Sequence, residues 1–567
     1  MSQSNTVRVA AVQYHVGTDV EKNLATGLRM LDEAAKCQPD LIVMPEFANH
    51  LSWYHDKQHC YDVSVSLDGP FLKAIADKAK ALGVYVVTNC TVQRPGNIAT
   101  GSSLMYSPSG ELVADNTKQI YIGHENDFLE KAAEPGPIIE TPIGRLGFYA
   151  CMDGVINETP RGLALRGAQV LCNSLNSFAT DEGSLHIPVR AAENRVFVVA
   201  ANKVGPLVPE EFVAAIAEQT GIPEVFLGGS GDSQIVAPDG TVLAHAKTKG
   251  EEVVYADIDP SLADDKRRPD GTDIFVSRRP ALYGAIARNP KQLPRAEMSG
   301  AASAQASVVM LKHAGNCGLD EACQQVAALA ADNHIIALPP LVLASEAEQP
   351  EAQLAFSEQA ISRLAAVCEE AWVTTALVLK NSLGKPQYCA VLIGRDGLRL
   401  QQGQIHHSER FAWSALSDEI DTALLPFGRV ALLTSDDSIY PEIYRLMAMA
   451  GVEVSAVALE PLQHWELETG LLERSAENRI NLLVAPSNPN FGPGFITALQ
   501  RDFTVLTQWQ ERPFDGLLSQ PGWHRMAADK RVISAEIFPA CAANKEVSRN
   551  TDLVDDRPWQ LVEALVV

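Results

Sequence analysis

The chain has 567 residues and a formal charge of −24, and 46% of its residues are apolar and 20% are charged. This length is too great for one compact core and favours two large domains. The negative charge disfavours nucleic acid as a partner. No apolar stretch of the sequence approaches the roughly 18–20 residues that span a bilayer, so we expect no membrane anchor.

The cysteines and the first residues both indicate a cytoplasmic protein. The ten cysteines are scattered, without a C-x-x-C pair or metal-ligand spacing, and most lie in apolar runs. Such usage suits a reducing compartment. The leader MSQSNTVRVAAVQ has no basic region followed by an apolar core, so we expect no secretion signal. We expect no cofactor and no metal.

In chain order, short apolar strands alternate with amphipathic helices. VRVAAVQ predicts a strand, the next stretch predicts a helix from about Val20 to Ala35, and LIVMPE predicts another strand. PFLKAIADKAKALG then predicts a helix that leads into the strand VYVVTN, and SPSG and APDG predict tight turns between strands. Pro209–Val225 predicts a helical insertion, with a lid as one hypothesis. The pattern predicts a layered α/β domain with largely buried strands.

The second half of the chain repeats the first half at a constant offset. Residues of Gly144–Val170 such as Gly144, Glu158 and Arg161 recur in Gly428–Val454, and the same register sets RAAENR on RSAENR. Other segments pair in the same order, such as PDLIVMPEF with DNHIIALPPL. The sequence therefore predicts a first domain over residues 1–292, a linker over 293–305 and a second domain of the same fold over 306–567.

Three residues of the first copy lie where strands end, the usual place for functional groups on such folds. Glu46 follows LIVMP, Lys118 follows the strands joined by SPSG, and Cys151 ends the strand GRLGFYA. Singly, they read as a structural ion pair, a surface lysine and a buried thiol. Together they offer a proton acceptor, a fixed positive charge and a nucleophile.

With these residues in this order, the chain resembles the nitrilase superfamily of carbon–nitrogen hydrolases. MPEF, LEKAAEPG, GRLGFYACMDGVINE, RAAENRVFVVAANKVG and RRPALY carry the resemblance over roughly residues 6–290. It implies that Glu46, Lys118 and Cys151 are catalytic. It also implies a four-layer αββα sandwich fold whose subunits associate in pairs, so that two tandem copies would form a pseudo-dimer within one chain.

The resemblance suggests further site residues. A second glutamate of the family's site maps best onto Glu130 in LEKAAEPG, with Glu125 as the competing assignment because it lies nearer the lysine. The backbone N–H of Met152 would hold an oxyanion together with the lysine. We also expect Phe47 and Asn173 to approach the substrate.

The second copy lacks the catalytic groups. Pro340 stands at the position of the glutamate, Ser435 at that of the cysteine, and Gly403 or Gln404 at that of the lysine. We expect this copy to be inactive and to shape one side of the Cys151 pocket as a built-in partner. Association into a further homo-oligomer stays open.

The leading functional prediction is hydrolysis of a small amide or N-carbamoyl amide through a thioester on Cys151. Glu46 would act as general base and acid, and Lys118 would stabilise the oxyanion. CMDG lacks the Cys-Trp-Glu that is typical of nitrile-cleaving members, which disfavours nitrile hydrolysis. A thioester-based N-acyltransferase is a second alternative, and a non-catalytic interaction scaffold is an alternative of another class.

Overall fold

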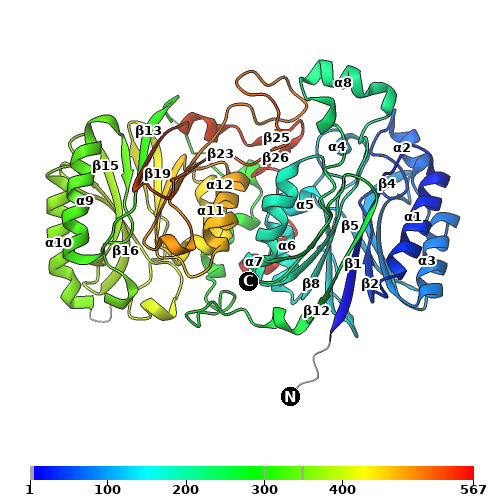
Figure 1. The fold of residues 1–567 in the computed structure, drawn as a ribbon, viewed down its shortest axis with the longest axis horizontal. Coiled ribbons are helices and arrows are strands. Elements are labelled where there is room, and N and C mark those ends of the chain that lie inside the picture. Colours follow the sequence, from blue (N-terminus) through cyan, green and yellow to red (C-terminus); the bar gives the residue numbers. More distant parts are fainter. Residues whose placement is uncertain (1–5, 295, 299, 347–349) are drawn as a thin grey trace.

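The computed structural model describes residues 6–294, 296–298, 300–346 and 350–567. We call the described residues up to 292 the first half and those from 304 onward, where the first strand of the second copy begins, the second half. Figure 1 shows two α/β bodies side by side, the first half in blue to green and the second in green to red. Among the described residues no helix combines the length and the apolar character that crossing a bilayer requires.

The first half contains two six-stranded sheets packed face to face. Their order is β12-β1-β2-β3-β4-β5 and β11-β10-β9-β8-β7-β6. Apolar side chains from both sheets form one continuous buried core between them. The strands are β1 (Val7–Gln13), β2 (Leu41–Val43), β3 (Tyr85–Arg94), β4 (Ile98–Tyr106), β5 (Leu112–Thr117), β6 (Ile139–Thr141), β7 (Gly144–Ala150), β8 (Val170–Ser174), β9 (Phe197–Ala201), β10 (Gln234–Val236), β11 (Val242–His245) and β12 (Glu252–Ile258).

The second half repeats this topology strand for strand, which confirms two copies of one mixed α/β fold. Its two six-stranded sheets have the order β17-β16-β15-β14-β13-β24 and β18-β19-β20-β21-β22-β23, and β25 (Glu546–Ser548) and β26 (Thr551–Asp552) form a separate two-stranded sheet. The strands are β13 (Ala304–Val309), β14 (Ile335–Ala337), β15 (Trp372–Lys380), β16 (Pro386–Gly394), β17 (Gly397–Gly403), β18 (Thr422–Leu425), β19 (Gly428–Leu433), β20 (Val454–Leu459), β21 (Asn481–Pro486), β22 (Phe495–Ala498), β23 (Gly522–Arg525) and β24 (Val532–Ile537).

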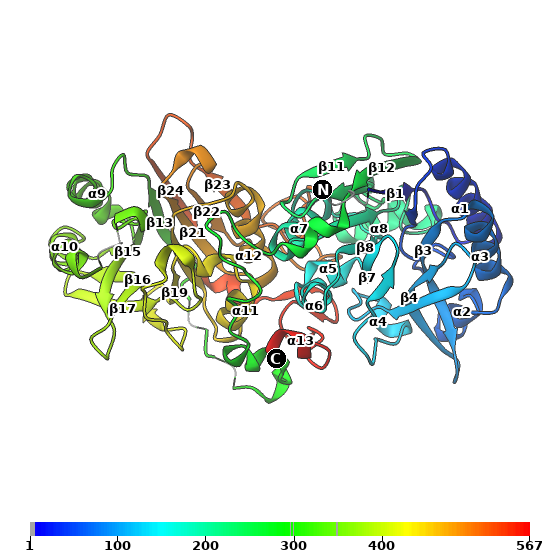
Figure 2. The same ribbon diagram turned by 90° about the horizontal axis from the view of Figure 1, so that it is seen from below.

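Helices cover the outer faces of the sheets, so that each half has four layers (Figure 2). The helix predicted from Val20 to Ala35 is present as α1, and Asp19 caps it by accepting from two backbone N–H groups of the first turn. The insertion predicted over Pro209–Val225 contains α8 (Val213–Thr220). The main covering helices are α1, α3 (Pro70–Leu82), α6 (Glu158–Leu165) and α7 (Ile187–Asn194) in the first half, and α9 (Gly315–Leu329), α10 (Pro350–Ala365), α11 (Pro441–Met449) and α12 (Leu471–Asn478) in the second.

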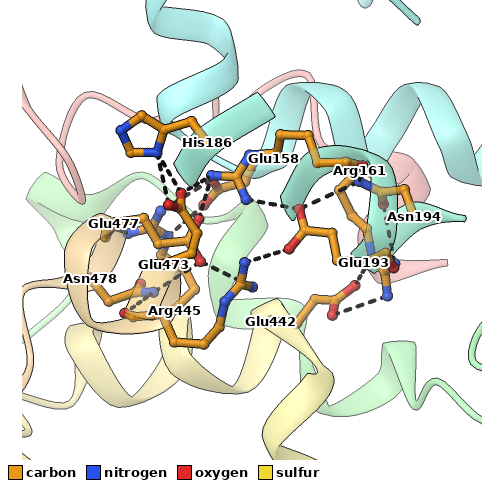
Figure 3. A network of polar contacts seen from close by, with 12 residues as sticks. Glu158, Arg161, His186, Glu193, Asn194, Glu442, Arg445, Glu473, Glu477 and Asn478 are labelled. Carbon is orange, nitrogen blue, oxygen red and sulfur yellow. Dashed lines mark hydrogen bonds and ion pairs between the residues drawn. The ribbon is translucent and has the colours of Figure 1, made fainter. Parts of the chain in front are cut away.

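The two halves meet through α6 and α7 on one side and α11 and α12 on the other (Figures 1 and 3). Buried ion pairs cross this contact in a reciprocal pattern. Arg161 binds Glu442 and Arg445 binds Glu158, while Arg190 binds Glu473 and Glu477 and Arg474 binds Glu193.

Each half also extends its C-terminal residues over the other half. Arg278, near the end of the first half, donates to Glu442 and to the carbonyl oxygen of Leu565. Leu565 lies in α13 (Glu563–Val566), which packs on α6. The two halves therefore share one extensive interface.

Candidate active site

Cys151 lies at the junction between β7 and the short helix α5 (Met152–Val155), with a φ of 46°. A positive φ is costly for a residue with a Cβ, and such strain is common at functional sites. The backbone N–H of Cys151 donates to Ser174 O at 3.1 Å and to Asn173 Oδ1 at 3.3 Å. The residue is 9% exposed. Burial and then the charge of Glu46 raise the pKa of the thiol well above its usual value, so the resting group is a thiol.

Lys118 lies between two buried carboxylates. Its Nζ donates to Glu46 Oε1 at 2.7 Å and to Glu125 Oε2 at 3.1 Å. Burial alone would lower the pKa of Lys118, but the charges of Glu125 and Glu46 outweigh it and hold the pKa well above its usual value. Burial raises the pKa of Glu46 towards neutrality, against the opposing charge of Lys118. The site therefore holds a permanent cation beside a carboxylate that is easily protonated.

The second glutamate on the lysine is Glu125, whereas the sequence favoured Glu130. Glu125 begins the short helix α4 (Glu125–Phe128), which directs its side chain inward. After this turn Leu129 forms a bridge to Ala99, and the next side chain, that of Glu130, is exposed. Glu130 contributes only its backbone oxygen, which accepts from Tyr121 Oη. Successive side chains of the extended segment after α4 point to opposite sides, so that Leu129 is buried and Glu130 is exposed. For this reason Glu125, and not Glu130, contacts Lys118.

Phe47 and Asn173, both expected near the substrate, lie beside the catalytic candidates. Phe47 has a φ of 50°, and its ring centroid is 5.6 Å from Lys118 Nζ. The Nδ2 of Asn173 is buried and has no hydrogen-bond partner. Met152 follows Cys151, and its side chain belongs to an apolar cluster with Ile120.

The sequence did not single out two further buried charged groups near this site. Lys203 follows β9, is 1% exposed and has an Nζ without a hydrogen-bond partner. Burial lowers the pKa of Lys203 to about 7. Glu182 begins a π-helical turn, and its Oε1 is also unpartnered. Burial raises the pKa of Glu182 to about 7. The only signal for Lys203 was its place in AANKVG, which carried the resemblance without giving it a role.

The loop after Lys118 is held by Asp153. Its Oδ1 accepts from the backbone N–H groups of Gln119 and Ile120. In the second half Asp437 accepts in the same way from Ile405 and His406. This correspondence sets Gln404, and not Gly403, at the position of Lys118.

In the second half, Ser435, at the position of the cysteine, and its neighbours are engaged in hydrogen bonds and ion pairs. Ser435 Oγ donates to Glu460 O at 3.0 Å and accepts from Glu460 N at 2.9 Å. Arg410 donates to Ser435 Oγ at 3.1 Å and forms an ion pair with Asp436. Arg268, from the first half, also binds Asp436, at 2.7 Å.

The described residues contain no cluster of histidine, cysteine, aspartate or glutamate side chains that could hold a metal ion. The groups of the site that can take part in chemistry are the thiol of Cys151, the carboxylates of Glu46 and Glu125, and the lysines Lys118 and Lys203.

Comparison with known proteins gives one family. Residues 8–268 match the model of the carbon-nitrogen hydrolase family. A protein of Pyrococcus abyssi named nitrilase is 27% identical over 280 residues, which are 49% of this chain and 99% of that protein. The omega-amidase NIT2 of Bos taurus is 27% identical over 296 residues, 50% of this chain and 99% of that protein. The N-carbamoylputrescine amidase of Solanum tuberosum is 26% identical over 301 residues, 49% and 94% of the two chains.

Among solved structures, an amidase from Nesterenkonia sp. is 22% identical, with a TM-score of 0.39 and coverage of 47% of this chain and 95% of that chain.

Proposed function

Since the N-terminal half of the chain belongs to the nitrilase superfamily and is a carbon–nitrogen hydrolase of the amidase type, we propose that it hydrolyses a small amide or N-carbamoyl amide through a thioester on Cys151. The observation that carries the proposal is the placement of Lys118 Nζ within hydrogen-bond distance of both Glu46 and Glu125, close enough to Cys151 for their charges to interact. The relatives named omega-amidase and N-carbamoylputrescine amidase support this class of substrate.

In the first step Glu46 takes the proton of the Cys151 thiol, and the thiolate attacks the amide carbon. The raised pKa of Glu46 suits it to this exchange, because a general base is most effective when its pKa is near the working pH. Lys118 and the backbone N–H of Met152 stabilise the negative charge that develops on the substrate oxygen. Glu46 then passes its proton to the departing nitrogen, and the thioester is left.

In the second step a water molecule loses a proton to Glu46 and attacks the thioester. The C–S bond breaks, the acid is released, and the sulfur recovers its proton from Glu46. Glu125 acts through Lys118, because its carboxylate accepts a second hydrogen bond from the ammonium group that also donates to Glu46. We therefore assign Glu125, in place of Glu130, as the second glutamate.

We further propose that the second half is a non-catalytic partner, so that the chain forms a pseudo-dimer within itself. Its Ser435 is bonded to the backbone of Glu460, and Pro340 and Gln404 supply neither a base nor a cation. The side chain of Arg410 lies next to Ser435 and forms an ion pair with Asp436.

Contacts near the active site support a shaping role for the second half. Met152 and Ile120 share one apolar cluster with Phe503 and Phe514 of the second half. Asp181, in the first half, accepts from the backbone N–H of Ser519 at 2.7 Å. The loop between β22 and β23, which carries these second-half residues, reaches α8 of the first half (Figure 1).

The test is ammonia release from a panel of amides, N-carbamoyl compounds and nitriles, with mass spectrometry of the whole protein during turnover. We expect amide or carbamoyl hydrolysis and a transient acyl adduct on Cys151. Cys151→Ala should abolish both, whereas Cys37→Ala, which removes a half-buried thiol elsewhere, should change neither. An active Cys151→Ala variant would overturn the proposal, and turnover of nitriles alone would replace it with nitrile hydrolysis.

A further inference from the structure

Lys203 is a buried lysine that the mechanism above does not use. Its backbone is clamped by the glycine loop that follows, because Gly231 N–H donates to Lys203 O at 3.0 Å and a Cβ on Gly229 would lie 2.3 Å from the same oxygen. Its Nζ lies 5.8 Å from the centroid of the Phe47 ring, the same ring that Lys118 Nζ approaches at 5.6 Å. The side chain is thus held beside the same ring as the catalytic lysine.

A buried ammonium group without a hydrogen bond is costly, and such groups are retained mostly where they have a task. The charges that act on Lys203 most strongly are those of Glu46 and then Glu125, followed by Cys151. All three belong to the site. Lys203 therefore interacts with the catalytic groups without bonding to any of them.

Glu46 presents the complementary unpaired atom. Its Oε1 accepts from Lys118, whereas its Oε2 is fully buried and has no partner. Oε2 and Lys203 Nζ are not bonded to each other, although their charges are opposite. A group that binds both atoms must donate to Oε2 and accept from Nζ.

The chemistry of the reaction limits what this group can be. The nitrogen of a substrate amide donates but does not accept, and the carbonyl oxygen accepts but does not donate. The carbonyl oxygen is moreover directed to Lys118. A water molecule both donates and accepts, and the second step of hydrolysis requires one next to Glu46.

We propose that Lys203 positions the hydrolytic water, which accepts from Lys203 Nζ while it donates to Glu46 Oε2. This inference rests on the proposed function. The water oxygen attacks the thioester carbon through its remaining lone pair, and its proton passes to Glu46. The tetrahedral intermediate then expels the Cys151 sulfur, which takes that proton, and the carboxylic acid leaves. Lys203 keeps its own proton throughout and is a positioning residue.

The experiment separates the two steps of turnover in a Lys203→Met variant, with a simple amide as substrate. We expect formation of the acyl-enzyme to continue and its hydrolysis to slow by roughly 10²-fold, the effect of losing one well-placed donor. The adduct on Cys151 should therefore accumulate in mass spectra at steady state. Hydroxylamine, which attacks thioesters without activation, should restore ammonia release and yield the hydroxamate. Lys203→Arg keeps a donor and should accumulate less adduct.

Lys266→Met provides the matched control. Burial likewise lowers the pKa of Lys266 to about 7, but its Nζ donates to the carbonyl oxygens of Asn194 and Arg195. Lys266→Met should lower the melting temperature without accumulation of adduct. Lys203→Met should not lower it, because Nζ has no hydrogen bond to lose.

Three results would overturn the inference: wild-type turnover by Lys203→Met, equal loss of adduct formation and hydrolysis, or unfolding of both Lys203 variants. A role in charge balance or packing would then replace it. If the wild-type protein itself forms no adduct and releases no ammonia from any amide, the proposed function fails instead.

Discussion

Arg161 in the first half donates from Nε to Glu442 Oε1 in the second half at 2.9 Å, and both side chains are buried. The reciprocal pair, Arg445 and Glu158, is equally buried, with 2.7 Å between Nε and Oε1. The two pairs differ in the surroundings of the glutamate, because Glu442 also accepts from Arg278 Nε at 2.9 Å. Glu442 therefore neutralises two arginines, and their charges hold the pKa of its carboxyl group at about 2 despite burial.

This asymmetry predicts unequal effects of two matched substitutions. Glu442→Gln leaves two buried guanidinium groups without a counter-charge, and we expect a loss of about 3–5 kcal/mol in the free energy of unfolding. Glu158→Gln leaves only the guanidinium group of Arg445 without its counter-charge, and the loss in the free energy of unfolding should be smaller. Urea unfolding measures both, with Glu251→Gln, from an exposed pair with Arg29, as a control of small effect. Equal losses for all three variants would contradict the prediction.

The two candidate second glutamates give a prediction about catalysis. Glu125→Gln removes the charge that faces Lys118 Nζ at 3.1 Å, so we expect kcat/KM to fall by roughly 10²-fold. Glu130→Gln changes an exposed side chain and should retain wild-type kinetics. Steady-state ammonia release distinguishes them. Loss of activity in Glu130→Gln with a normal Glu125→Gln would restore the assignment that the sequence favoured.

The sequence was sufficient to predict the duplicated fold and the proximity of the catalytic candidates. The apolar runs mark the strands, and Glu46, Lys118 and Cys151 all follow strand ends, where neighbouring loops converge. The choice between Glu125 and Glu130 depended on the single turn of α4, which reverses the direction of the side chains within five residues. Local pattern cannot specify such a turn.

The contact between the halves was harder to predict from the sequence. The repeat showed that RAAENR and RSAENR occupy equivalent places, and it suggested a packing role. Which arginine meets which glutamate depends on how two folded bodies dock, as in the pairing of Arg190 with Glu473 and Glu477. The sequence did not indicate Lys203 for a related reason. Its burial and its unpaired Nζ arise only from the tertiary structure.

The raised pKa of Glu46 predicts the pH dependence of the first step. Glu46 must be ionised to take the thiol proton, and burial shifts its ionisation from the range of an ordinary glutamate towards neutrality. Activity should therefore rise with pH through the range from about 5 to 8. The measurement is kcat/KM for a neutral amide, with buffers of constant ionic strength. A profile that is flat between these values would contradict the assignment of Glu46 as the base.

The second half should contribute no chemistry of its own. Ser435→Ala removes the only hydroxyl at the position of the nucleophile, and its Oγ is already engaged with the backbone of Glu460. We expect unchanged kcat and KM and a small loss of stability, about 1 kcal/mol, from the lost hydrogen bonds. Kinetics and thermal unfolding of the same preparation test this. A loss of turnover comparable to that of Cys151→Ala would show that the second copy is catalytic.

A histidine at the contact between the halves predicts how stability depends on pH. His186 is buried, with Nδ1 2.8 Å from Glu473 Oε2 and Nε2 2.7 Å from Ser519 Oγ. Burial alone would lower the pKa of His186, but Glu473, with smaller contributions from Asp181 and Glu182, raises it from 6.5 to about 9. Because the folded-state pKa is the higher one, the stabilisation is complete below pH 6.5 and is lost as the pH rises through 9.

The loss should amount to about 3 kcal/mol at most, given the size of the shift. Urea midpoints of the wild-type protein should fall between these pH values. His186→Gln cannot titrate, so its midpoints should fall less steeply over the same range while starting lower at pH 6. Parallel curves for the two proteins would mean that His186 is neutral in the folded state and that its bond to Glu473 is an uncharged one. In that case the arginine–glutamate ion pairs between the halves would account for most of the contact, and alkaline pH would not weaken that contact.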